Sequence, residues 1–240
     1  NLAVVDINGS TLTSEDSRSF SNLTLRGDGR LSVTSGSVVE VTGTFEWSAG
    51  TIARDGRLII ASGAVANLTT GSGKFIDGVF ENRGATHYTG TGLFFGRDAG
   101  NLPARIENAA GGTWIVEGEG DFTQFNGSPN YRIDNAGTFI KRGAGTVTII
   151  NSPIFFGSTG TVAVESGELR LNGGSSLGGV VNGAGALTFF GGSHTIPPGG
   201  DFAVTSLSLN NVNLTLAPGS APNLAVVDIN GSTLTSEDSR

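Results

Sequence analysis

The sequence predicts an all-β fold, a parallel β-helix (β-solenoid), and three observations support this. Apolar and polar residues alternate over short segments, glycine is frequent (39 of 240 residues), and short motifs return at a regular spacing. Alternation indicates strands with one buried face, frequent glycine indicates many turns, and returns of roughly 20–50 residues are typical of repeat architectures. Helical spacing of apolar residues is absent, so we expect almost no helix.

The alternating segments also predict which side chains form the core. In residues 161–165, for example, Val162 and Val164 alternate with Thr, Ala and Glu. Because every second side chain of a strand points to the same face, such pairs form buried rows. The core rows predicted in this way contain Phe45, Trp47, Val147, Ile149, Val162, Val164, Leu169 and Leu171.

Repeated motifs set the expected length of one coil. Residues 105–109 (RIENA) return as 132–136 (RIDNA), and residues 28–31 (DGRL) return as 55–58, with the same offset in both cases. Coils of about 23–27 residues stacked about 4.8 Å apart would place roughly nine coils in 222 residues. A propeller fits less well, since one blade needs about 40 residues, and a β-sandwich does not account for the returns.

Three asparagines occupy the same place in successive coils: Asn82, Asn108 and Asn135. If the coils stack in register, their amides form a hydrogen-bonded ladder along the axis. The alternative is a turn position at the strand end, which Asn tolerates. We favour the ladder, and the two interpretations predict different burial of the side chains.

The two ends of the chain have the same sequence, because residues 1–18 and 223–240 both read NLAVVDINGSTLTSEDSR. We therefore interpret 1–222 as one β-solenoid repeat unit and 223–240 as the start of the next identical unit. Such identity indicates a natural tandem array with homogenised copies or an engineered join, and we favour the array. The lack of Met indicates an excerpt of a longer product.

Composition excludes several classes of protein. The absence of Cys excludes a disulfide scaffold and thiolate metal sites. A net charge of −7, without a cluster of cations, argues against a nucleic-acid partner. No apolar run is long enough for a membrane span.

Several motifs resemble the glycine-rich β-helical repeats of large bacterial surface proteins, of the filamentous-haemagglutinin and autotransporter-adhesin kind. The resembling segments are 43–52 (GTFEWSAGTI), 134–141 (DNAGTFIK), 160–169 (GTVAVESGEL) and 191–196 (GGSHTI). The resemblance implies a right-handed parallel β-helix, secretion, and a structural or adhesive role, with no catalytic residues. The period set by the identical ends is longer than the short repeats of that family.

Few residues are candidates for a functional site. Glu117, Glu119 and Asp121 alternate and would bind Ca²⁺ if they shared one face, but a solvated acidic stripe is the simpler interpretation. His87 and His194 are far apart and are expected to face solvent, and Tyr88 and Tyr131 are candidates for glycan contact or core-edge packing. Asn-x-Ser/Thr sequons, which glycans could occupy, begin at Asn8, Asn22, Asn67, Asn126, Asn213 and Asn230.

The repeated end predicts the function. A solenoid exposes unpaired backbone groups on its outermost coils, and here the end repeats the beginning, so that coil can stack on coil. We expect a non-enzymatic structural subunit or repeat of an extracellular, cell-surface filament or stalk, whose partners are further copies of itself. The alternatives are an adhesin that binds glycans or host surfaces and, less favoured, a polysaccharide-active β-helix enzyme. No cofactor is expected, with Ca²⁺ as the one candidate.

Overall fold

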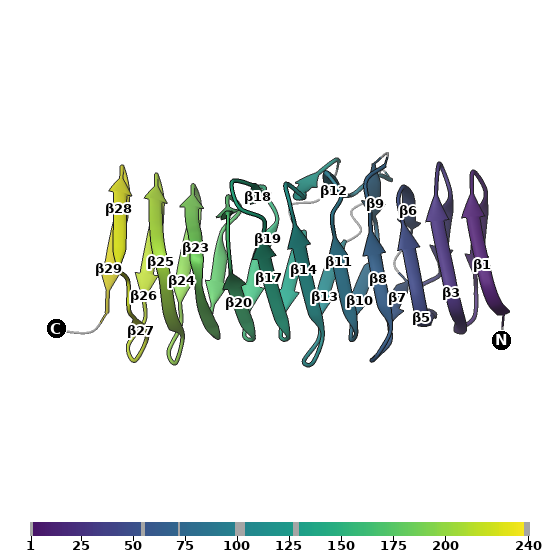
Figure 1. Ribbon diagram of the computed structural model, residues 1–240, viewed down its shortest axis with the longest axis horizontal. Coiled ribbons are helices and arrows are strands. Elements are labelled where there is room, and N and C mark those ends of the chain that lie inside the picture. Colours follow the sequence, from purple (N-terminus) through teal and green to yellow (C-terminus); the bar gives the residue numbers. More distant parts are fainter. Residues whose placement is uncertain (1, 54–55, 72, 99–103, 127–129, 238–240) are drawn as a thin grey trace.

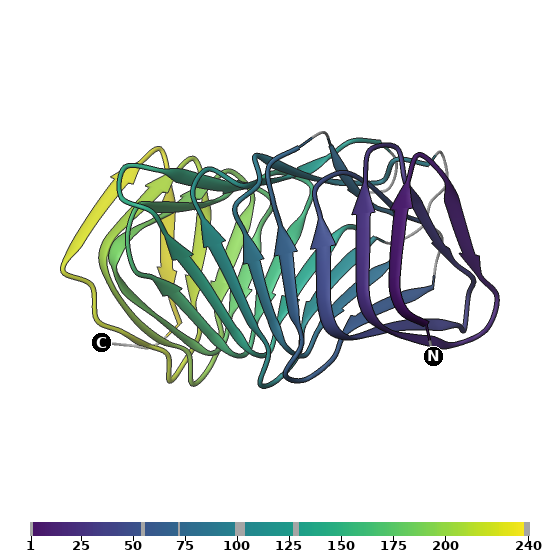
Figure 2. The same ribbon diagram turned by 45° about the vertical axis from the view of Figure 1, so that its right-hand side comes forward.

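The computed structural model describes residues 2–53, 56–71, 73–98, 104–126 and 130–237. In these ranges the chain contains strands, turns and no helix, and every strand pair is parallel. The strands stack as an elongated β-solenoid of about 11 turns, with the two ends of the chain at opposite ends of the rod (Figures 1 and 2). The predicted fold class is confirmed. The described residues include no helix of the length and hydropathy that would cross a membrane.

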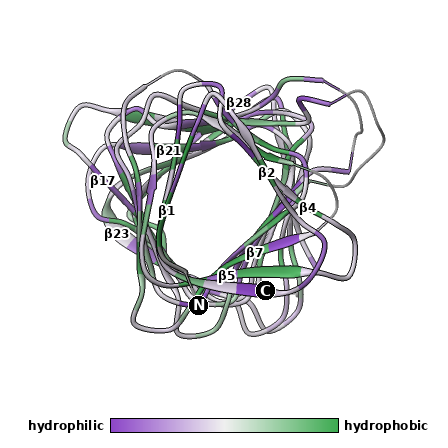
Figure 3. Ribbon diagram, turned by 90° about the vertical axis from the view of Figure 1, so that its right-hand side faces the viewer, coloured by the Kyte–Doolittle hydropathy of each residue, from purple (hydrophilic) through white to green (hydrophobic). Residues whose placement is uncertain are grey.

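Each coil contributes a strand to three faces, which meet at short corners. Four long strands bend around a corner and serve two faces: β3 (Arg18–Arg26) and β5 (Val38–Trp47) run from face 1 to face 2, and β23 (Val180–Phe190) and β25 (Asp201–Asn210) run from face 2 to face 3. Seen along the axis, the coils superpose around one interior (Figure 3), which core side chains fill.

The remaining strands each belong to one face, apart from Leu2 at the start of β1, which pairs with Phe20 on face 1. Face 1 contains β7 (Arg57–Ile60), β10 (Val79–Asn82), β13 (Arg105–Asn108), β16 (Arg132–Asn135), β19 (Phe155–Ser158), β22 (Ser175–Leu177), β24 (Ser193–Ile196), β26 (Asn213–Leu216) and β29 (Thr233–Ser236). Face 2 contains β1 (Leu2–Asn8), β8 (Val65–Leu68), β11 (Ala85–Tyr88), β14 (Thr113–Glu117), β17 (Thr138–Arg142), β20 (Thr161–Val164) and β27 (Ala221–Pro222). Face 3 contains β2 (Thr11–Ser14), β4 (Arg30–Val33), β6 (Gly50–Ala53), β9 (Lys74–Ile76), β12 (Gly92–Phe95), β15 (Asp121–Gln124), β18 (Val147–Ile150), β21 (Glu168–Leu171) and β28 (Val226–Asn230).

The coils are more numerous and less uniform than the motifs predict. One turn of the rod leads from Val5 to Leu23 near its beginning, whereas a longer turn leads from Leu93 to Phe122 near its middle. The expected coil length therefore holds only for part of the rod. The expected nine coils for 1–222 are too few, because β28 follows β1 by ten turns and one face.

Aromatic rings form the centre of the interior. Phe45 packs on Trp47 at 5.9 Å between ring centroids, and Phe80 lies 5.4 Å from the ring of Trp114. The stack continues through Trp114, Phe122, Phe139 and Phe156, with centroids 5.3–6.3 Å apart. Such offset and edge-on contacts add to the stabilisation by apolar burial, so the rings tie consecutive coils together along the axis.

Six of the eight predicted core residues are buried: Phe45, Trp47, Val162, Val164, Leu169 and Leu171. Val147 and Ile149 are half-buried on the outer surface, so the prediction was wrong for these two. Their neighbours Thr148 and Ile150 point inward instead. Ile150 is in register with Phe122 and Leu171, which fixes the inward parity of β18, and the Thr148 hydroxyl donates to the Gly118 carbonyl.

The two identical end segments adopt the same local structure on different faces. In the first copy they form β1 on face 2 and β2 on face 3, whereas in the second copy they form β28 on face 3 and β29 on face 1. The corners between them match, since Gly9 has φ = 62° and Gly231 has φ = 59°. The same sequence therefore suits two different faces of the rod.

Candidate functional site

The most structured part of the surface is the outer side of face 1, where short Arg-x-acid motifs stack in register. Arg105 lies beside Arg132, and Glu107 lies beside Asp134. The outward positions of β7, β10, β13 and β16 thereby form two rows, one mostly basic and one mostly acidic, because alternate residues of a strand share a face. We call the charged side chains of these rows, together with Arg83 just after β10, the charged face; it comprises Arg57, Glu81, Arg83, Arg105, Glu107, Arg132 and Asp134.

Ion pairs of the charged face join one coil to the next. Arg57 contacts both Glu81 and Glu107, so it spans three coils. Arg105 contacts Glu107 at 3.3 Å and Asp134 at 3.6 Å. Because several charges share partners, the network restricts the side chains more than isolated surface pairs do.

The network also sets the protonation of its members. Partial burial would raise the pKa of Glu81, but hydrogen bonds from Arg83 and Arg57 outweigh it and hold the pKa below its usual value. Burial likewise opposes the charge on Arg57, but its bonds to Glu107 and Glu81 leave its pKa raised. Both groups are therefore charged at neutral pH.

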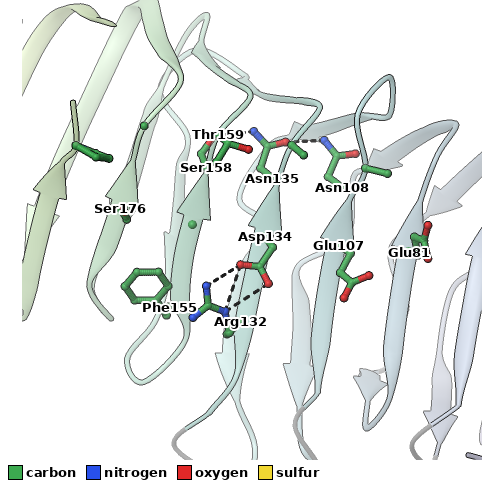
Figure 4. A pocket seen from close by; sticks show the side chains of 15 residues that line it. Glu81, Glu107, Asn108, Arg132, Asp134, Asn135, Phe155, Ser158, Thr159 and Ser176 are labelled. Atoms are coloured by element: carbon green, nitrogen blue, oxygen red, sulfur yellow. Dashed lines mark hydrogen bonds and ion pairs between the residues drawn. The ribbon is translucent and has the colours of Figure 1, made fainter. Parts of the chain in front are cut away.

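A hollow of about 420 Å³ adjoins the C-terminal end of the charged face (Figure 4). Arg132 lies between Asp134, at 2.8 Å, and the ring of Phe155, whose centroid is 4.8 Å from the guanidinium carbon. Beyond Phe155 the outward positions are small, including Gly157 and Ser176, which leaves the space open. The hollow combines a planar cation, a carboxylate and an aromatic ring on a rigid sheet.

The three predicted asparagines are buried, and two of them, Asn108 and Asn135, line the inner edge of the hollow. Asn82 Nδ2 donates to Asn108 Oδ1 at 2.8 Å, and Asn108 Nδ2 donates to Asn135 Oδ1 at 2.7 Å. The chain of bonds ends at Ser158, whose hydroxyl accepts from Asn135 Nδ2 at 2.9 Å. The structure therefore brings these residues together as a ladder, which positions the corner between faces 1 and 2.

The acidic candidates for Ca²⁺ are not arranged along one strand. Glu117 ends β14 and lies 3.7 Å from Arg142, whereas Asp121 begins β15 and accepts a hydrogen bond from the Ile149 amide. The chain turns between them, so the predicted alternation on one face is wrong. Among the described residues, no group of three or more His, Cys, Asp or Glu side chains is placed to hold a metal ion.

The histidines and tyrosines differ in their surroundings. His87 is partly exposed on face 2, 4.0 Å from Glu117. The expectation that His194 faces solvent is wrong, since it is buried, stacks on Phe189 and bonds to Ser175. Tyr88 and Tyr131 are both fully buried in the core, so neither is placed to contact a glycan.

The sequons lie mostly on the surface. Asn8, Asn22, Asn126, Asn213 and Asn230 are exposed. Asn67 is half-buried, and its amide donates to Glu46 at 2.6 Å.

The charged face was not predicted from the sequence, although the motifs that build it were visible. RIE (105–107) and RID (132–134) belong to one of the motif returns. Reading the Arg-x-acid spacing as two outward positions on stacked strands would have indicated the two rows. The ion pair of Arg57 with Glu107 could not be predicted in this way, because the two residues are far apart in the chain.

Comparisons with known proteins give no relative: no family model matches the chain, and neither a curated protein nor a solved structure is similar to it at a significant level.

Proposed function

We propose that the chain is a structural subunit or repeat of an extracellular filament or stalk, built by end-to-end stacking of β-solenoid units. The observation that carries the proposal is the state of the last coil. Its inward apolar side chains are uncovered, and its sequence is that of the first coil. A partner that continues the solenoid would cover these side chains.

The inward residues of the last coil differ in exposure from their neighbours one coil earlier. Val227, Ile229 and Leu234 are 39%, 49% and 44% exposed. Their register partners Leu207, Leu209 and Leu214 are buried. Burial of apolar surface favours association, so this end of the rod is suited to receive another coil.

The strand edges at both ends are also free to pair. β28 and β29 pair with β25 and β26, and β1 and β2 pair with β3 and β4. Among the described residues, no strand lies on the other side of these four. An open edge presents unpaired N–H and C=O groups that template a further strand, and head-to-tail contacts of this kind produce filaments.

The extracellular location rests on the resemblance of the motifs to surface-protein repeats. In the proposed role the axial hydrogen bonds and the stacked core carry load, and the chain has no catalytic activity. Turnover of pectin or alginate by the purified chain would contradict this part of the proposal.

Electron microscopy of the purified chain over a range of concentrations tests the assembly. About 11 coils at about 4.8 Å each predict filaments with an axial rise of roughly 50 Å per chain. Ile229→Lys, which places a charge in the uncovered interior of the last coil, is expected to abolish them. Val180→Lys is the matched control, since Val180 is an exposed apolar residue on the side of the rod. Monodisperse monomers at all concentrations would overturn the proposal.

A second candidate function, binding of a surface glycan, is favoured by the hollow beside Phe155. Arginine, carboxylate and aromatic groups on a rigid sheet can hold a sugar ring through hydrogen bonds and stacking. A glycan array with the native chain and Phe155→Ala tests this function. Binding that is lost in the variant would support an adhesin role, and no binding by the native chain would remove it.

A further inference from the structure

The two copies of the end segment differ in position by ten turns and one face. The first copy places residues 4–8 on face 2, beside β3, and the second places residues 226–230 on face 3, beside β25. The parity of the side chains is the same in both, because Ile7 lies beside Leu25 and Ile229 lies beside Leu209, both buried core residues. The segment thus points the same side chains inward at the two ends, a third of a turn apart, although they are covered at the first end and exposed at the second.

We propose that two copies of this chain join with β28 against β1 and β29 against β2, in register, so that each copy is turned by one face relative to the one before it. This inference rests on the proposed end-to-end assembly and specifies its geometry. Identical residues then lie on one another, as in the in-register stacking of identical strands. Inside the rod Val227 meets Val5, Ile229 meets Ile7, and Leu234 meets Leu12.

The corners of the two end coils favour this rotation. β28 and β29 are separated by Gly231 and Ser232, and β1 and β2 by Gly9 and Ser10, with the same backbone conformation at the glycine. With the faces aligned instead, the Gly231 corner would meet the longer corner between β2 and β3, which contains residues 15–17. Parallel strands pair continuously around a corner only when the corners have the same shape, so the rotated stack preserves more hydrogen bonds.

One contact of the rotated stack is unfavourable. Asp228 would lie directly on Asp6 at the outer surface, and like charges in this position repel. Arg26 binds Asp6 through two hydrogen bonds from the next coil and partly compensates its charge. This contact distinguishes the rotated stack from the aligned one, in which Asp228 would face β2, whose outward residues are Thr11 and Thr13.

The rotation has a consequence for the surface of the filament. The charged face and its hollow would point in one direction in the first copy, a third of a turn away in the second, and another third away in the third. Three copies restore the original orientation. A stalk built in this way presents the same surface to all sides, whereas an aligned stack would present it along one side only.

Disulfide cross-linking tests the geometry, since the chain contains no cysteine. Asp228→Cys is mixed with Asp6→Cys, Thr11→Cys or Thr13→Cys and oxidised, and the linked peptides are identified by mass spectrometry. Directly opposed residues on neighbouring strands are close enough for a disulfide. We expect links between positions 6 and 228 and none from 228 to 11 or 13.

Links from 228 to 11 or 13, without links to 6, would overturn the rotation and leave end-to-end assembly standing. No links in any mixture, together with a monomeric mass by light scattering, would overturn both.

The self-association of Asp228→Asn gives an independent readout. In the rotated stack, removing the repulsion is expected to tighten self-association about four-fold at low salt. The matched control Asp201→Asn, exposed on β25 one coil before the end and outside the proposed contact of β28 with β1, is expected to leave it unchanged.

Discussion

Asn108 donates one amide hydrogen to Asn135 Oδ1 at 2.7 Å and approaches the carbonyl of Thr138 at 3.1 Å with the same nitrogen. The Asn108 side chain therefore binds two parts of the next coil: the Asn135 side chain before the corner and the Thr138 backbone after it. Asn82 and Asn135 make the same pair of contacts, to Thr113 and Thr161. The repeated arrangement fixes where face 1 ends and face 2 begins.

Asn108→Ala is expected to destabilise the fold by about 1–3 kcal/mol, since it leaves the buried Asn135 Oδ1 without its donor. The urea midpoint of unfolding, followed by circular dichroism, measures the change. Asn182→Ala on β23 is the control, because Asn182 is exposed, and its midpoint is expected to stay unchanged. Equal midpoints for native chain and Asn108→Ala would show that the ladder adds no stability.

Gly160→Ala is expected to be more damaging than its size suggests. Gly137 and Gly160 stack at the corner beside the ladder, and a Cβ on Gly160 would lie 2.1 Å from the Gly137 carbonyl oxygen. Because the clash is with backbone, neighbouring coils must separate, and we expect a loss of about 1–3 kcal/mol or more. Gly157→Ala is the control in the same region. Its Cβ would approach only side-chain atoms, at 3.2 Å or beyond, so similar losses in both variants would contradict this explanation.

The fold class could be predicted because alternation and motif returns are local properties of the sequence. The number of coils could not, because the two returns do not measure an average coil. The return of 105–109 at 132–136 spans one long central coil, whereas the return of 28–31 at 55–58 leads from β4 on face 3 to β7 on face 1 and spans more than one coil. The coil that joins Leu169 to Leu187 is shorter than the spacing of any of these returns. In residues 147–150 (VTII) apolar residues occupy both parities, so only the register with Phe122 determines which side chains are buried.

The charged face shows a different limit of sequence analysis. Its strands were predictable, but its ion pairs depend on which coils are adjacent. Arg57 meets Glu107 only because β7, β10 and β13 are consecutive rows of one face. That order follows from the coil lengths, which the motifs gave only in part.

His194 predicts a loss of stability in mild acid. Burial lowers its pKa in the folded chain, so on acidification the unfolded chain gains the proton first. The contribution of neutral His194 is fully present above about pH 6.5 and is lost below it, by up to about 1.4 kcal/mol per pH unit.

Urea midpoints at pH 7.5 and 5.5 measure this effect. His194→Gln, which does not titrate, is expected to lose less stability between the two pH values than the native chain. His87→Gln, at a partly exposed position, should behave like the native chain. An equal loss in native chain and His194→Gln would assign the acid sensitivity to other groups.

The lysines give a test of the interior that needs no stability measurement. The chain has two, Lys74 and Lys141, and they are 1% and 0% exposed. Lys141 Nζ donates to the Gly118 and Arg142 carbonyls and to the Thr146 hydroxyl, so all three of its hydrogens are satisfied inside the rod.

An amine-reactive ester should therefore modify neither Lys74 nor Lys141 in the native state and both in urea, as counted by mass spectrometry. Arg18→Lys, at an exposed position, is expected to react in the native state and shows that the reagent is active. Rapid modification of Lys141 without denaturant would mean that β17 does not point this side chain into the rod.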